Sequence, residues 1–144
     1  MLFRSKLGLA NIITLLALVV FEFKTALTVI FLRTILGSLL SGNLFGVGFL
    51  MSFSGALTAG CVMALFLRFS TFFSLIGISI AGAVAHCVGQ LIMAAFIIIQ
   101  PGIFFYLPVM LLLSVPTGCI TGYLLKELVK FLESTNRFDM LSYE

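Results

Sequence analysis

The sequence predicts an all-α integral membrane protein, folded as a bundle of five transmembrane helices. Hydrophobic residues make up 62% of the 144 residues and charged residues only 9%, whereas soluble domains carry roughly 25% charged residues. The apolar residues form long runs, each close to the ~20 residues that a helix needs to cross the hydrocarbon core. No stretch alternates polar and apolar residues over the length of a barrel strand, so a membrane β-barrel does not fit.

Short polar breaks divide the chain into five apolar runs, and each run predicts one helix. The breaks lie at residues 21–24, 42–46, 68–71 and 100–102. We therefore expect helices over about 7–21, 25–42, 46–67, 72–98 and 103–125. A transmembrane domain then covers residues 1–128, and residues 129–144 form a charged cytoplasmic tail.

The first run begins after Arg4 and Lys6, which is also how a signal peptide begins. No clear small-residue cleavage site follows Val20, and the run continues directly into a multispanning pattern. We therefore interpret it as the first transmembrane helix.

The basic residues between the runs predict how the bundle is oriented. With five spans the two termini lie on opposite sides, and Lys and Arg concentrate on the cytoplasmic side. Arg4 and Lys6 lie on the side of the N-terminus. The other side holds Lys24, Arg68, Lys126, Lys130 and Arg137. We therefore expect a multi-pass protein of the cell membrane with an external N-terminus and a cytoplasmic C-terminus.

The composition argues against several classes of function. The formal net charge of +3 arises from few charges at helix ends, so it does not indicate nucleic-acid binding. Cys61, Cys87 and Cys119 lie in separate apolar runs, and with one histidine they do not form a zinc motif. We expect inert packing cysteines, no metal, no cofactor and no catalytic constellation in this chain.

Two ionisable residues lie near the middle of predicted helices, Arg33 in the second and His86 in the fourth. A guanidinium at the centre of a bilayer costs at least about 2.5 kcal/mol on insertion scales. No acidic residue lies within any predicted span to neutralise it. An anionic ligand or a proton-linked partner would explain Arg33.

Further polar residues are expected on the outer side of these two groups. Gln90 follows His86 by one helical turn, and Ser38 lies beside the face of Arg33. Other outer positions are Asn11, Thr14, Asn43 and Gln100. We predict an outward-facing substrate-binding site formed by Arg33, His86, Gln90, Asn11, Ser38 and Asn43. The alternative is that these groups only bond neighbouring helices, which fits Ser, Thr and Asn better than Arg33.

Small residues recur at four-residue spacing in three of the runs. The fourth run carries Gly77, Ala81, Ala85 and Gly89, the third carries Gly55/Ala59 and Ala56/Gly60, and the fifth carries Gly118/Gly122. Such spacing lets helices approach closely in membranes. We expect the motifs of the third and fifth runs to pack within the molecule first and to dock a partner second.

Three segments resemble a known family. They are Lys6-Leu-Gly-Leu-Ala-Asn11-Ile, Leu32-Arg33-Thr-Ile-Leu-Gly37-Ser38-Leu-Leu and Ala81-Gly-Ala-Val-Ala-His86-Cys-Val-Gly89-Gln90-Leu. In this order they look like the Gx transporter family, also called heptaprenyl diphosphate synthase component I. The likeness covers about residues 6–128.

The resemblance implies a fold and a function. That family is similar to the substrate-binding S-components of energy-coupling-factor transporters, which have six helices with both ends in the cytoplasm. Only six residues precede Leu7 here, so the chain looks like the six-helix fold without its first helix. We then expect the ladder of Gly77, Ala81, Ala85 and Gly89 to be unpaired, and a further helix or a second copy of the chain to cover the groove.

Three functions remain open at this stage. The first is an S-component-like subunit that binds a small molecule, such as an anion, and works with a coupling subunit and ATPases. The second is a non-catalytic membrane subunit of prenyl diphosphate or quinone synthesis, because Asp139 alone cannot hold the Mg²⁺ that such chemistry requires. The third is an assembly subunit of a membrane electron-transfer complex.

Overall fold

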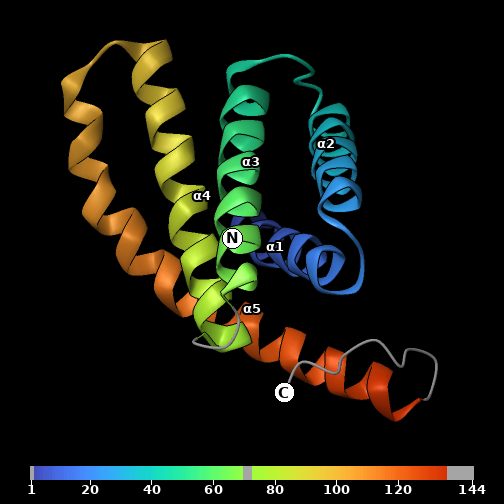
Figure 1. Cartoon of the computed structure of the whole chain (residues 1–144). Coiled ribbons are helices and arrows are strands. Elements are labelled where there is room, and N and C mark those ends of the chain that lie inside the picture. Colours follow the sequence, from blue (N-terminus) through green and yellow to red (C-terminus); the bar gives the residue numbers. More distant parts are fainter. Residues whose placement is uncertain (1, 70–72, 136–144) are drawn as a thin grey trace.

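The computed structural model describes residues 2–69 and 73–135, and the side chains of residues 2–10 and 101 fall outside this description. Five α-helices and one short 3₁₀ helix form the described part (Figure 1). Their bounds are α1 Leu2–Val20, α2 Phe23–Leu40, α3 Val47–Arg68, α4 Leu75–Ile98, η1 Pro101–Tyr106 and α5 Leu107–Ser134. The predicted all-α fold of five helices is therefore confirmed.

Four of the helical segments are long and apolar enough to cross a membrane. They are Phe23–Leu40, Val47–Arg68, Leu75–Ile98 and Gly102–Ser134. In α1 the side chains are described only from Asn11 to Val20. This apolar stretch is by itself shorter than a helix that crosses a membrane. The chain is thus a multi-pass membrane protein, and the crossing by α1 stays a prediction.

The fifth helix is longer than expected. The predicted helix ended near residue 125, but α5 continues to Ser134. Leu125 and Val129 keep the continuation helical, because one turn apart they are both buried against the bundle. The first six residues of the expected charged tail, 129–134, are thus helical, and the tail beyond residue 135 lies outside the described residues.

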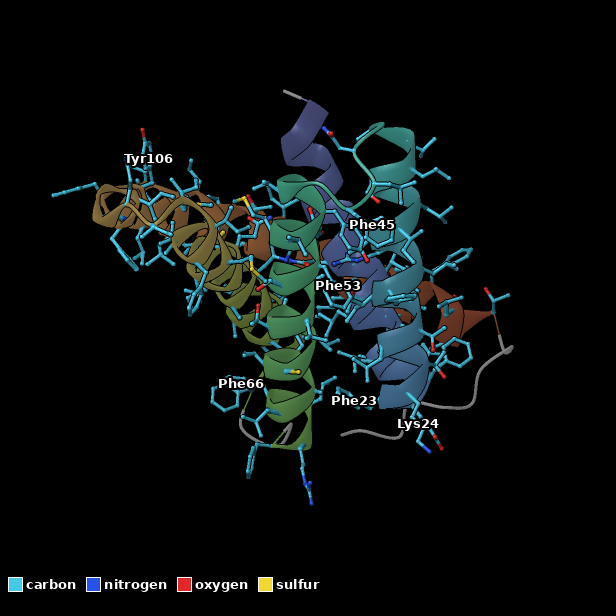
Figure 2. All side chains as sticks on the ribbon, turned by 90° about the horizontal axis from the view of Figure 1, so that it is seen from above. Phe23, Lys24, Phe45, Phe53, Phe66 and Tyr106 are labelled. Carbon is cyan, nitrogen blue, oxygen red and sulfur yellow. The ribbon has the colours of Figure 1, made fainter. Side chains whose placement is uncertain are left out.

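The helices are arranged around α3 and α4. Figure 1 shows α3 between α2 and α4, with α5 beside α4 and α1 crossing behind α3 toward α2. Phe31 of α2 meets Phe53 of α3 edge to face at 6.1 Å between ring centroids. Phe53 in turn stacks on Phe49 at 6.0 Å, so an aromatic row joins α2 and α3 (Figure 2).

Close helix contacts depend on glycines without side chains. A Cβ added to Gly118 would lie 2.7 Å from the Cα atom of Ile80, and one added to Gly122 would lie 2.7 Å from the Cα atom of Ile76. The backbone of α5 therefore runs directly against α4 at both positions. The small-residue pair of α5 packs within the molecule, as expected.

The prediction that the ladder on α4 is unpaired is wrong for Ala85 and Gly89, whereas a Cβ at Gly77 would meet, among the described residues, only the Ser74 hydroxyl at the start of α4 itself. A Cβ at Gly89 would lie 3.0 Å from the carbonyl oxygen of Ser54 in α3. The carbonyl of Ala85 accepts a hydrogen bond from Thr58 of the same helix α3. The partner of the ladder is α3 because the two helices approach closely along this face.

One end of the bundle is filled by an apolar core. Its buried residues come from α1, α3, α4 and α5: Leu15, Ala59, Met63, Ile78, Leu125 and Val129. Partly buried Phe66, Leu67 and Leu75 pack against it from the α3–α4 turn. Lys24 and Phe66 lie at this end, whereas Phe45 and Tyr106 lie at the other (Figure 2). We call these six buried residues the apolar layer.

The first prediction concerns the close contact of α4 with α5. Gly122→Ala should destabilise the protein by about 1–3 kcal/mol, as overpacking of a tight contact does. Gly37→Ala is the matched control, since a Cβ there meets nothing within 4 Å among the described residues. It should be neutral or stabilise the helix by up to ~1 kcal/mol. Unfolding in mixed micelles measures both, and equal effects of the two substitutions would contradict the packing.

Candidate functional site

The candidate site is centred on Arg33 of α2. Its side chain is half-buried, and its Nη1 atom is fully buried. Within the described part of the chain Nη1 has no hydrogen-bond partner. The described acidic residues, Glu22, Glu127 and Glu133, all lie outside the interior of the spans. A buried cationic donor is therefore left without the partner that such groups normally require.

His86 and Gln90 of α4 come together on Gly55 of α3, as the sequence predicted for neighbours one turn apart. A Cβ at Gly55 would lie 3.1 Å from Cε1 of His86 and 2.6 Å from Cγ of Gln90. Glycine is therefore required at residue 55 for both side chains to occupy this space. His86 is only 5% exposed.

The imidazole of His86 has unused hydrogen-bonding capacity. Both ring nitrogens are buried, and neither has a partner of normal hydrogen-bond geometry in the described structure, although the ring lies against the backbone of Gly55. The guanidinium of Arg33 is close enough to act electrostatically on this ring. Arg33 of α2 and His86 of α4 are thus two buried polar residues whose charges influence each other.

Asn11 of α1 is the third residue with an unused buried atom. It is 7% exposed, and its Oδ1 has no hydrogen-bond partner among the described residues. One turn later, Thr14 lies 4.0 Å from the Cβ position of Gly60, which also meets Ile30 of α2. The chain turns back between α1 and α2, so the distance from this turn grows toward the start of α1 and toward the end of α2. Asn11 and Arg33 are therefore each one turn beyond this contact, on the same side of it.

The two remaining predicted site residues are placed differently. Ser38 is buried, but its hydroxyl donates to the carbonyl of Ile35 in its own helix at 2.8 Å. Asn43 is exposed in the α2–α3 turn, and its backbone N–H donates to the carbonyl of Ser38 at 3.1 Å. The structure thus places Gln90 beside His86 against α3 and leaves Asn43 at the end of the bundle, whereas Arg33 reaches His86 only through its charge.

Between Arg33 or Gly55 and the α2–α3 turn, each of the two helices carries an exposed glycine. Gly37 follows Arg33 by one turn and Gly48 precedes Gly55 by two turns, so each lies on the same helix face as its partner. Both glycines are exposed, and a Cβ on either would meet no described atom within 4 Å. In the opposite direction the apolar layer fills the bundle.

Two residues that hold α4 in place were not predicted as part of the site. The Ser54 hydroxyl donates to the carbonyl of Gly89 at 3.0 Å. The Thr58 hydroxyl shares its one hydrogen between the carbonyl of Ala85 at 3.1 Å and two carbonyls of its own helix, those of Ser54 and Gly55, at 2.9 Å. The bonds to Gly89 and Ala85 join α3 to α4 on either side of Gly55, and so determine how His86 is presented. Their spacing of four residues on α3 was the available signal, because it places both hydroxyls on one face.

The chemistry of the group is that of a binding site. Arg33 and His86 supply donors, Asn11 supplies an amide, and the described residues contain no cluster of three His, Cys, Asp or Glu side chains that could hold a metal ion. Cationic and neutral donors buried together favour an anion. Cys61 and Cys119 are exposed on the helix surface, and Cys87 lies 3.9 Å from the carbonyl of Met110.

Fold and site together define a multi-pass helical membrane protein with a buried polar group between its helices. The family model described as heptaprenyl diphosphate synthase component I matches residues 3–128. The chain belongs to this family, and the resemblance given above under that name is confirmed. The match does not carry the Gx transporter name. No curated protein and no solved structure matches the chain significantly.

The second prediction tests the bonds that hold α4 against α3. Thr58→Val should destabilise the protein by about 0.6–2 kcal/mol, the range for hydrogen bonds between membrane helices. Thr28→Val is the control, since Thr28 is exposed and bonds only the carbonyl of Lys24 in its own helix. Thr58→Ser should recover most of the loss. If Thr58→Val and Thr28→Val unfold alike in mixed micelles, the bond to Ala85 does not hold α4.

Proposed function

We propose that this protein is a membrane-embedded binding subunit for a small anionic molecule, of the S-component-like kind. The observation that carries the proposal is the buried Nη1 atom of Arg33, which has no partner in the described structure. An unpaired guanidinium within a span costs about 2.5–3.5 kcal/mol on insertion scales. A bound anion would offset this cost, and no described acidic residue is placed to do so.

The surroundings of Arg33 support reversible binding of a ligand. A free ring nitrogen of His86 can donate to such an anion, and the free amide oxygen of Asn11 can accept from a hydroxyl or amide group of the same ligand. Open space beside Gly37 and Gly48 supports entry from the end of the bundle at the α2–α3 turn. The apolar layer at the other end argues against a continuous pore. A ligand would thus be held, and its onward movement would require a coupling subunit and ATPases.

The name of the family favours a second candidate. A component of a heptaprenyl diphosphate synthase could be a membrane subunit that holds a prenyl diphosphate for a separate catalytic partner. Diphosphate chemistry of this kind uses Mg²⁺ held by carboxylates, and the described residues hold no carboxylate cluster. For this second candidate, Arg33 binds a phosphate group of the prenyl diphosphate, and the chain itself performs no catalytic step. Both candidates share the same anion site.

The third prediction tests the anion site. Native mass spectrometry of the gently purified protein should show a bound anionic molecule on the wild type. Arg33→Ala should reduce its occupancy at least about tenfold, since a charge-assisted contact is worth 1.5–3 kcal/mol. Arg68→Ala, at the exposed end of α3, should leave it unchanged.

The identity of the bound molecule separates the two candidates. A water-soluble metabolite would support the binding subunit of a transporter, whereas a prenyl diphosphate would support the synthase subunit. If folded Arg33→Ala protein carried the same molecule at wild-type occupancy, the anion site would be wrong in both versions.

The fourth prediction concerns orientation in the cell membrane. We propose that the end with Lys24, Arg68, Lys126 and Lys130 faces the cytoplasm, because basic residues concentrate there. In a variant without the native cysteines, Gly102→Cys should react with an impermeant maleimide added to intact cells. Thr135→Cys should react only after the cells are opened. The reverse pattern would show that the site faces inward.

A further inference from the structure

Helix α5 is longer than a helix needs to be to cross a membrane, and the excess lies in its distal part. The helix has 28 residues, or about 42 Å at 1.5 Å per residue, against a hydrocarbon core of about 30 Å. Its last ten residues include four exposed charged side chains: Lys126, Glu127, Lys130 and Glu133. Figure 1 shows this part running obliquely below α3 and α1 instead of alongside α2 and α3. It therefore lies where the bundle meets the membrane surface.

This part of α5 has an apolar half and a charged half. Leu125 and Val129 face the bundle and belong to the apolar layer. Next to them around the helix lies a second apolar row at i, i+4 and i+7, formed by Leu124, Leu128 and Phe131, which we call the distal stripe. Its residues are exposed, Phe131 by 65%. The four charged residues occupy the remaining half of the circumference.

A bilayer surface fits the distal stripe better than a protein partner. The transmembrane helices hold this segment at the end of the bundle, so the stripe is already at the level of the lipids. Half-apolar, half-charged helices with lysines on the polar half are typical of the membrane–water interface. Lys24 lies near the start of α2 at the end of the bundle that also holds Phe66 (Figure 2). Arg68 is the last residue of α3, two residues after Phe66, and Lys126 and Lys130 lie on this part of α5 itself. These cations complement anionic lipid headgroups.

We propose that Leu124–Ser134 lies in the plane of the membrane–water interface, with the distal stripe at the acyl-chain boundary and Lys126 and Lys130 on anionic lipid headgroups. The proposal does not depend on the function of the Arg33 site. It makes this segment an in-plane anchor that is continuous with the apolar layer through Leu125 and Val129.

Tryptophan fluorescence tests the proposal directly, because the chain contains no tryptophan. Phe131→Trp places a reporter on the distal stripe, and Glu133→Trp places one on the charged half of the same helix. Both positions are exposed, so neither change should disturb the fold. Each variant is reconstituted into vesicles of phosphatidylcholine and phosphatidylglycerol, with and without bromine on the acyl chains.

The expected result is a blue-shifted emission for Phe131→Trp that brominated lipid quenches several-fold more than that of Glu133→Trp. Aqueous iodide should show the opposite order. Equal iodide quenching of the two variants would overturn the in-plane placement. Emission from Phe131→Trp that neither quencher reaches would also overturn it, and would assign the stripe to a protein contact instead.

The lysines are tested in the same system. Replacing Lys126 and Lys130 together by Gln should remove the difference in bromine quenching of Phe131→Trp between vesicles with and without phosphatidylglycerol. If that difference persists unchanged, or is absent from the protein with both lysines, the headgroup contact is wrong.

Discussion

The burial of Arg33 without an acidic partner is the constraint on which the rest of the structure depends. A guanidinium inside a bilayer needs hydrogen-bond acceptors or water, because the hydrocarbon supplies neither. The described part of the chain supplies no acceptor for Nη1 of Arg33. The guanidinium acts electrostatically on His86, whose ring nitrogens have no partner of normal hydrogen-bond geometry either. Unpaired polar atoms of this kind are rare in stable interiors unless something binds there. The anion that we propose would remove this conflict.

The close approach of α3 and α4 makes this arrangement possible. Gly55 has no side chain, so His86 and Gln90 can lie against α3, and Gly89 allows α4 to come near Ser54. The hydroxyls of Ser54 and Thr58 then bond the backbone of α4 on either side. Beyond this region the apolar layer closes the bundle, and α5 contributes Leu125 and Val129 to it. The same helix that closes the site thus reaches the membrane surface through its distal stripe.

The sequence predicted the helices well, and it selects Arg33 and His86 as candidate site residues, because both follow from the cost of placing polar groups in hydrocarbon. Long apolar runs locate the spans, and depth alone identifies Arg33 and His86. Features that depend on helix contacts were missed. The charged residues after Leu125 led to the prediction of a tail. The helix continues instead because Val129 is buried against other helices, and a linear sequence pattern does not show such burial. Likewise, nothing in the spacing of Gly89 shows that α3 covers it.

The most direct measurement is an experimental map of the wild-type protein, extracted with its native lipids and resolved well enough to show bound molecules. Our account predicts non-protein density within about 2.7–3.2 Å of Nη1 of Arg33, the range of a hydrogen bond, and in contact with His86. A map in which a protein carbonyl or carboxylate occupies that place, with Arg33 fully paired inside the chain, would contradict it.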